Sequence, residues 1–429
     1  MKRLFLLVLC LMLLVSMVGC RNSVQGKQNE EAKPTEEPTL ATDPATEEPS
    51  SRAKWYLTQQ TKDHAASVEL PDFIMEDEDL KQLVVDYIDS QLADYVADFE
   101  LTLSNEDVTA KFGDYLYQLD LDCRISYISD EIASVIFEGM YNGKTAAHPV
   151  FCFYSLNIDR RTNEQLKLYD LIPTNDAMYA AFVQCAYQSM KEKADPAWLA
   201  GVNFYDVVCS DGDFTGCFYD HSNAACAYFT ETGIGISYAV SHPLGDHQET
   251  EIPYSLVGIT KPEDALEKPS TTVTLFDGRF TCDSSADFLD TYQIYDKSGA
   301  VVAEDTFKYF QFYPLDDSIF AVFVQAGNTI AARGGFFYDF ANDRQSERFH
   351  YIVGFSDTLV VTAGSDSVVI VQSIFDDSFY LELSDFEYPL ANSVEWLQDA
   401  ELSPDDKSVT ITYLSGEHFE RKIQTFKLH

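Results

Sequence analysis

Period-two alternation of apolar and polar residues dominates this sequence and restricts it to sheet-rich folds. The alternation is clearest in three segments of the first half, Tyr115 to Ile128, Ile132 to Tyr141 and Pro149 to Ile158. It returns in almost every segment after residue 270, interrupted by turn sequences such as Asp277-Gly278 and Lys297-Ser298-Gly299. Because successive side chains of a strand point to opposite faces of a sheet, this pattern predicts strands with one buried face.

Two segments carry the three- and four-residue spacing of helices instead. The first runs from Leu80 to Phe99 and follows an acidic turn, Glu76 to Asp79, at the end where the helix dipole favours negative charge. The second runs from Asp176 to Lys193. With a strand expected at Ser67 to Ile74 and three more between residues 225 and 253, these elements predict an α+β domain over residues 54–260, an antiparallel sheet covered by helices.

Residues 271–429 predict an all-β domain, reached through a short acidic connector at 261–270 that contains Pro262 and Pro269. Three of its segments share a turn followed by an apolar strand: Asp317 to Val322, Asp366 to Val371 and Lys407 to Thr412. Their separation of roughly 40 to 50 residues suits the blades of a β-propeller. The expectation for this domain is therefore either propeller-like blade repeats or a β-sandwich.

The N-terminus has the layout of an export signal. Lys2 and Arg3 precede an apolar run, Leu4 to Val15, which is shorter than the roughly 20 residues of a membrane-spanning helix. The sequence Met17-Val18-Gly19-Cys20 resembles the lipobox of bacterial lipoproteins. By this resemblance, residues 1–19 are a cleaved lipoprotein signal peptide, and Cys20 carries diacylglycerol on its sulfur. The expected location is extracytoplasmic, on the bacterial cell membrane; an ordinary secreted protein is the alternative.

Residues 20–53 are expected to form a tether between the lipid and the first domain. They are rich in Glu, Pro, Thr and Ser, with hardly a large apolar side chain. Such a composition cannot bury enough surface to offset chain entropy, so this acidic segment is expected to be disordered and extended.

The order of motifs in the first domain resembles a known extracellular domain. The segments that carry the resemblance are Tyr141 to Pro149, Leu156 to Asp159, Leu166 to Ile172, Phe229 to Ile236 and Glu251 to Leu256. Over residues 70–258 they are similar to the extracellular domain of RsiV-type anti-sigma factors, which also precedes the catalytic part of PdaC-type peptidoglycan deacetylases. The resemblance implies a binding domain, because the outer domain of RsiV-type proteins binds lysozyme.

Two activities of these families are not expected here. RsiV-type proteins have a cytoplasmic sigma-binding part and a membrane span, whereas this chain begins with an export signal. PdaC-type deacetylases need a metal-binding aspartate and a paired-histidine motif. Ile374 to Ser378 is similar to the aspartate motif, but His418 and His429 are too far apart to form the pair. Asp376 and Asp377 are therefore expected in a turn between strands.

The loop from residue 141 to 148 supplies the candidate ligand-binding residues, Tyr141 and His148. His148 is interpreted as a structural hydrogen-bonding residue rather than a catalytic base. Where the families have Gly-Gly before Ala-His, this chain has Thr145-Ala146, which puts any function of the loop's backbone geometry in doubt.

Motifs of catalysis are absent from the sequence. It has no Gly-rich phosphate loop, no Gly-x-Ser-x-Gly nucleophile elbow and no His-Glu-x-x-His zinc helix. A proline and a glycine interrupt the loop that carries part of the one histidine cluster, so its members are interpreted as solvated loop residues rather than metal ligands. The cluster consists of His221, His242, Asp246 and His247. No catalytic residue, metal or cofactor is therefore expected.

Seven cysteines remain once Cys10 is removed with the signal and Cys20 is lipidated. An odd number cannot all pair in disulfides, and most are interpreted as buried free thiols. They are Cys123, Cys152, Cys185, Cys209, Cys217, Cys226 and Cys282.

Charge excludes one class of partner and favours another. The chain has 29 basic and 70 acidic residues, a formal net charge of −41, and the acidity is heaviest from Glu69 to Asp107. Nucleic-acid binding requires a basic surface, whereas a cationic partner would be steered towards this chain. The sequence predicts a lipid-anchored cell-surface protein that binds a cationic protein such as lysozyme, or a cell-wall component such as peptidoglycan, without catalysis. The alternative is a cell-wall glycan-modifying enzyme or an accessory subunit of one.

Overall fold

A computed structural model of the chain gives a protein built mostly of β-strands. It describes residues 55–60, 64–92, 102–104, 117–143, 149–193, 225–240, 247–284, 289–307, 310–325, 333–364, 368–387, 396–415 and 418–428. These belong to one compact unit, residues 52–429. In the described residues no helix is long and apolar enough to cross a membrane. The expected signal peptide, Cys20 and the tether lie outside the described residues.

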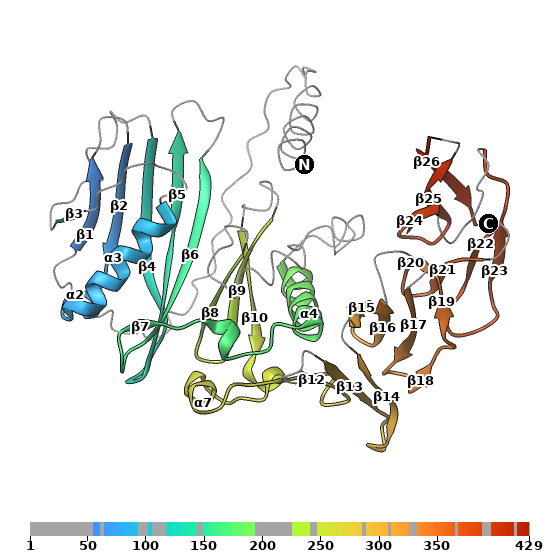
Figure 1. Cartoon of the computed structure of the whole chain (residues 1–429), viewed down its shortest axis with the longest axis horizontal. Coiled ribbons are helices and arrows are strands. Elements are labelled where there is room, and N and C mark those ends of the chain that lie inside the picture. The colour runs from blue at the N-terminus through green and yellow to red at the C-terminus, as the bar shows by residue number, and fades with distance from the viewer. Residues whose placement is uncertain are drawn as a thin grey trace, which may run out of the picture. The chain divides into compact units, whose positions relative to one another are not determined.

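A seven-stranded sheet, sheet A, contains the first strands of this unit (Figure 1). Its strand order is β3-β1-β2-β4-β5-β6-β7. β2 and β4 run parallel while the other neighbours are antiparallel, so the predicted antiparallel sheet is in fact mixed. A parallel pair needs a crossover connection, and α2 and α3 lie in it. The strands are β1 (Trp55–Gln60), β2 (His64–Leu70), β3 (Thr102–Ser104), β4 (Tyr117–Ile128), β5 (Ile132–Gly143), β6 (Val150–Asp159) and β7 (Glu164–Gln165).

Helices α2 (Asp72–Met75) and α3 (Glu78–Leu92) cover one face of sheet A. The predicted apolar stripe of α3 packs against the sheet, with Val84 and Ile88 buried. α3 begins after the predicted acidic turn, where the Asp77 carboxylate accepts the backbone amides of residues 79 and 80 at 3.0 and 3.1 Å. This is N-capping of the kind that stabilises a helix start. The described helix ends at residue 92, and the remainder of the predicted stripe, 93–99, lies outside the described residues.

The strand predicted at Ser67 to Ile74 is shorter than expected. β2 ends at Leu70, and Ile74 belongs to α2. Pro71 lies between them and has no amide hydrogen to donate to a strand ladder, which explains why the alternating pattern does not continue as a strand.

A three-stranded antiparallel sheet, sheet B, follows with the order β10-β9-β8. Its strands are β8 (Ala225–Phe229), β9 (Gly233–Ala239) and β10 (His247–Pro253). Helix α4 (Asp176–Lys193) has the predicted bounds and packs on one face of this sheet, where the rings of Phe182 and Tyr238 meet edge to face at 5.2 Å. Asn175 caps the helix by accepting the amide of Met178 at 3.0 Å.

Strand β8 meets the face of sheet A through side chains rather than through another strand. Ser155 Oγ and Asn157 Nδ2 donate to the Ala227 carbonyl oxygen at 2.8 and 3.1 Å. The Phe229 amide donates to Ser134 Oγ at 3.0 Å, and all three polar side chains are buried. Because a buried main-chain group without a partner is costly, this network fixes where β8 meets sheet A.

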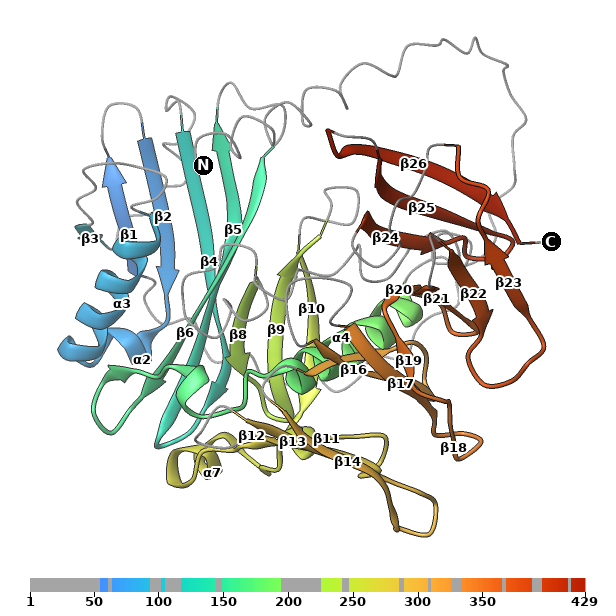
Figure 2. The same cartoon turned by 45° about the vertical axis from the view of Figure 1, so that its right-hand side comes forward.

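The described residues of 271–429 form four further sheets, each a run of antiparallel strands, so an all-β region is confirmed (Figures 1 and 2). Successive sheets share hydrophobic cores. Sheet C contains β11 (Thr272–Leu275), β12 (Phe280–Ser284), β13 (Asp290–Tyr295) and β14 (Val301–Phe307). Sheet D contains β15 (Phe310–Pro314), β16 (Ile319–Gln325), β17 (Arg333–Asp339), β18 (Arg344–Gln345) and β19 (Phe349–His350). Sheet E contains β20 (Ile352–Phe355), β21 (Leu359–Ala363), β22 (Val369–Ser373) and β23 (Tyr380–Leu383), and sheet F contains β24 (Leu397–Leu402), β25 (Ser408–Ser415) and β26 (Glu420–Lys427).

The predicted internal repeat does not fully coincide with these sheets. Two of its three segments form β16 and β25, which are second strands of their sheets, but the third forms β22, the third strand of sheet E. The structurally equivalent strand is β21. Second strands therefore begin at Phe280, Ile319, Leu359 and Ser408. The error arose because short apolar strands resemble one another whatever their place in a sheet.

The predicted connector at 261–270 contains the short helix α7 (Pro262–Glu267). Its Ala265 is buried, and Tyr127 of β4 donates a 2.8 Å hydrogen bond to its Glu263. The largest hydrophobic core includes Phe182 of α4 as well as Phe280 of sheet C. Two 3₁₀ turns, η2 (Leu168–Asp170) and η5 (Tyr254–Val257), also contribute to this core. Apolar packing is thus continuous from α4 through α7 into the all-β region.

Candidate functional site

Acidic side chains gather on the face of sheet A opposite α3. Asp122 of β4 is paired with Glu138 of β5, and Glu69 of β2 is one residue past the paired Val68 and Leu121. Three carboxylates therefore stand on neighbouring strands, which lie about 4.8 Å apart in a sheet. Like charges placed directly opposite each other across strands destabilise a sheet.

A fourth carboxylate extends this group along β4. Asp120 lies two residues before Asp122, on the same face, and accepts a 2.6 Å hydrogen bond from Ser67 Oγ. Asp120 and Asp122 are both exposed. We call the surface formed by Glu69, Asp120, Asp122 and Glu138 the acidic face.

Arg124 joins the acidic face to sheet B. Its guanidinium donates to Glu249 of β10 at 2.7 Å and to Glu138 at 3.3 Å. It also lies 5.7 and 5.8 Å from the ring centroids of Phe153 and Tyr228, within cation–π range. Burial lowers the pKa of Arg124, but the two carboxylates outweigh this and hold the pKa above its ordinary value.

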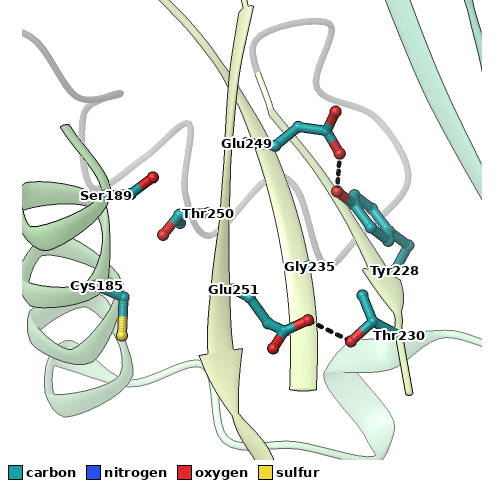
Figure 3. A pocket seen from close by; sticks show the side chains of 8 residues that line it. All are labelled: Cys185, Ser189, Tyr228, Thr230, Gly235, Glu249, Thr250 and Glu251. Carbon is teal, nitrogen blue, oxygen red and sulfur yellow. Dashed lines mark hydrogen bonds between the residues drawn. The ribbon is translucent and has the colours of Figure 1, made fainter. Parts of the chain in front are cut away.

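A cavity of about 400 Å³ lies at the β10 edge of sheet B (Figure 3). Because successive side chains of a strand point to opposite faces, Glu249 and Glu251 line one side of β10 and Thr250 lines the other. α4 contributes Cys185 and Ser189 on the Thr250 side. The residues that line the cavity thus come from both faces of an edge strand.

Two hydroxyl groups hold the Glu251 carboxylate in place. Thr230 Oγ1 donates to one of its oxygens at 2.5 Å and Thr232 Oγ1 to the other at 2.7 Å. Among the described residues, no lysine or arginine forms an ion pair with Glu251. Glu251 therefore has two hydrogen-bond donors and, within the described residues, no basic side chain as a counter-ion.

Gly235 makes the room between Glu251 and the neighbouring strand. It pairs with Glu251 on one side and with Tyr228 on the other. A Cβ atom at this position would come within 2.2 Å of the Tyr228 ring, so any larger residue would displace the ring. Tyr228 in turn donates its hydroxyl hydrogen to Glu249 (Figure 3). The ring and both carboxylates are therefore arranged around a position that only glycine fits.

The titratable groups of the cavity are suited to binding. Burial, aided by Glu251, raises the pKa of the Cys185 thiol to about 12. Burial and the bond to Glu249 raise the pKa of Tyr228. Both groups are protonated at neutral pH, whereas a nucleophile requires the deprotonated form. In the part of the chain that the structure describes, no three His, Cys, Asp or Glu side chains form a group that could hold a metal ion.

Of the two residues predicted from the 141–148 loop, Tyr141 is the one that the structure describes. Tyr141 packs on the α3 side of sheet A, where its ring stacks on Tyr117 at 6.3 Å, so it does not belong to the acidic face. Burial raises its pKa. The candidates His148, His221, His242 and Asp246 lie outside the described residues.

His247 is the described member of the predicted histidine cluster. It begins β10, interacts with Ser237 Oγ through Nδ1 at 3.3 Å and stacks on the ring of Phe153 at 6.1 Å. Asp376 accepts the amide of Ser378 at 2.9 Å in the turn between β22 and β23, as predicted.

The described cysteines are Cys123, Cys152, Cys185, Cys226 and Cys282, and none of them forms a disulfide with another described cysteine. Three of them are buried, whereas Cys123 and Cys185 are partly exposed. Cys209 and Cys217 lie outside the described residues.

Sequence reasoning missed Arg124, Glu138, Tyr228 and Glu249. One signal was available, because Asp120, Asp122 and Arg124 occupy alternate positions of a correctly predicted strand. Such spacing places them on one face, but it does not show which strand lies beside them.

Neither a protein-family model nor a curated protein sequence matches the chain. Among solved structures, a DUF3298 family protein of Pseudomonas aeruginosa is 16% identical, with 50% of this chain and 94% of that chain covered and a TM-score of 0.31. A DUF3298 family member of Bacteroides fragilis is 12% identical, with 49% and 94% covered and a TM-score of 0.29. An acylaminoacyl peptidase of Pyrococcus horikoshii is 8% identical, with 71% and 45% covered and a TM-score of 0.25.

Proposed function

We propose that this chain is an extracytoplasmic binding protein that recognises a cationic protein such as lysozyme through the acidic face, without catalysis. The observation that carries the proposal is the placement of Glu69, Asp122 and Glu138 side by side on neighbouring strands. Two unit charges about 4 Å apart repel each other by about 1 kcal/mol in water. Arg124 already pairs with Glu138, and a basic partner would reduce the remaining repulsion on binding, so the arrangement favours a complex with a cationic protein.

The formal net charge of −41 supports the same partner class. A strongly charged surface attracts an oppositely charged protein over a Debye length of about 8 Å at physiological ionic strength. Attraction of this kind raises the association rate and falls as salt is added.

The proposal includes attachment to the membrane through Cys20. Diacylglycerol and a further acyl chain would hold the protein stably on the membrane, because each methylene buried in the bilayer contributes about 0.8 kcal/mol to the binding free energy. The tether of residues 20–53 would then hold the acidic face away from the membrane, within reach of proteins that arrive from outside.

Retention of lysozyme on the immobilised mature chain tests this function. We expect retention at low salt and its loss at high salt. Asp120→Asn/Asp122→Asn removes two exposed charges of the acidic face and should weaken binding about tenfold. Both amides keep an oxygen acceptor, so the hydrogen bond from Ser67 Oγ to residue 120 can persist.

The matched control is Glu304→Gln/Glu401→Gln, which removes the same charge from exposed positions in sheets C and F. Equal weakening by the two double variants would show that total charge, rather than the acidic face, determines binding. Absence of retention at low salt would exclude lysozyme. Release of acetate or sugar from peptidoglycan by the purified chain would favour the glycan-modifying enzyme instead.

A further inference from the structure

The cavity at β10 is a second candidate binding surface, separate from the acidic face. β10 is an edge strand of sheet B, with β9 as its only strand neighbour among the described residues. The cavity continues from the Glu249 and Glu251 side of this strand to the Thr250 side (Figure 3). A compact ligand would occupy one side, whereas an added strand would present side chains to both.

The second side of the cavity carries two hydroxyl groups. Thr250 is only 7% exposed, and Figure 3 shows it pointing towards α4. Ser189 of the helix is partly buried and also lines the cavity. Neither hydroxyl makes a side-chain hydrogen bond within the described residues, so both can donate to or accept from a group bound in the cavity.

The side of β10 that carries Glu249 and Glu251 favours a positively charged ligand. The carboxylates of Glu249 and Glu251 accept hydrogen bonds, and Glu251 is held by Thr230 and Thr232 with no lysine or arginine of the described residues beside it. A carboxylate has about four acceptor positions, so each retains capacity after its two protein donors. Arg124 already pairs with Glu249, whereas a lysine or arginine of the ligand would give Glu251 the basic partner that it does not have among the described residues.

We propose that an extended basic segment of the cationic partner adds as a strand to the β10 edge. Its basic side chains lie against Glu249 and Glu251, and the residues between them face Thr250, Cys185 and Ser189. Main-chain hydrogen bonds supply affinity in strand addition, and the alternating side chains supply specificity. This inference rests on the proposed function for the charge of the partner, but it uses a different surface from the acidic face.

A synthetic peptide with the repeating sequence Thr-Lys, seven residues long and capped at both ends, tests the inference by calorimetry on the full mature chain. We expect saturable binding, with increased protection of the β10 amides in hydrogen exchange. A matched peptide with Glu in place of Lys should not bind. Two further peptides carry N-methyl groups on their odd or on their even residues, which prevents main-chain pairing along one edge of the peptide. One of these two peptides should bind at least tenfold more weakly than the unmethylated peptide.

Glu251→Gln is the matched protein variant, because its amide oxygen can still accept a threonine hydroxyl. It should weaken peptide binding about tenfold, as expected for loss of one charge-assisted hydrogen bond, while Glu304→Gln should not. Thr250→Val, of nearly the same volume, is a second variant and should weaken binding by a smaller factor. Circular dichroism checks that each variant is folded.

If the peptide binds, two results would still overturn the inference. One is equal binding of the peptide to wild type and Glu251→Gln. The other is tighter binding of a peptidoglycan fragment than of the peptide, with protection of the same amides, which would assign the cavity to a glycan. Lysozyme retention without peptide binding overturns the inference and leaves the proposed function intact. Peptide binding without lysozyme retention supports the inference and excludes lysozyme as the partner.

Discussion

Asp159 illustrates how one side chain links this fold to pH. It lies at the end of β6 and is 8% exposed. Arg161 holds it through two side-chain hydrogen bonds, from Nε at 2.9 Å and from Nη2 at 2.6 Å. These bonds, which outweigh the effect of burial, keep the pKa of Asp159 below its ordinary value. The folded state therefore favours the ionised form of the Asp159 carboxyl group.

We expect Asp159→Asn to lower the free energy of unfolding by about 1 kcal/mol or more at pH 7. A carboxyl with a lowered pKa contributes stability above its unfolded pKa of about 3.9, and this contribution is lost as pH falls through the folded value. The difference between variant and wild type should therefore shrink below pH 4. Urea unfolding from pH 7 to pH 2.5 measures it.

The exposed Asp130, in the turn before β5, provides a comparison. Asp130→Asn should leave the free energy of unfolding nearly unchanged over the same range. If Asp159→Asn is equally destabilising at pH 2.5 and pH 7, the ion pair is not the source of the effect.

At the scale of elements, patterns confined to one segment were predictable, and relations between segments were not. α4 has the predicted bounds, because its apolar spacing and the residue that caps it all lie within a short stretch. β4, β5 and β6 were located for the same reason. The parallel pairing of β2 with β4 was missed. Two helices separate these strands in the sequence, and the alternating pattern within each strand does not show which strand will be its neighbour.

The joint between sheets A and B makes an element-scale prediction. Ser134 Oγ is the acceptor for the buried Phe229 amide of β8. Ser134→Ala would leave that amide without its partner, at a cost of about 1 to 3 kcal/mol. Chemical denaturation measures the change in the free energy of unfolding.

Ser126→Ala serves as the control, because Ser126 Oγ only donates to the Ser134 carbonyl oxygen and lies in a partly buried position. Its cost should be clearly smaller than that of Ser134→Ala. Equal costs would show that hydration satisfies the Phe229 amide once the serine is removed.

On the scale of the whole molecule, the largest hydrophobic core extends across the predicted connector. It combines Phe182 and Ile252 from before residue 261 with Phe280 and Phe310 from after it. We therefore expect a fragment of residues 52–260 to expose apolar surface and to aggregate or lose its near-ultraviolet circular dichroism. A monomeric fragment with native-like spectra and cooperative unfolding would contradict this.

The continuous core also explains the limit of sequence reasoning at this scale. The prolines at 262 and 269 correctly marked a break in the strand pattern, but Pro262 begins a helix instead of an exposed linker. Likewise, the acidity of the chain was evident from composition, whereas its concentration on one face of sheet A depends on which strands become neighbours.

The side-chain network at β8 has a consequence for how many segments one chain can capture. Ser134, Ser155 and Asn157 bind the Ala227 carbonyl oxygen and the Phe229 amide, so within the described residues the β8 edge of sheet B lies against sheet A. The edge left for a further strand is β10. A partner segment bound there would be capped on its far side by the partner itself, so the expected stoichiometry is one to one. A sheet that can add a strand at one edge only binds a single partner segment, and it cannot link successive copies into a polymer.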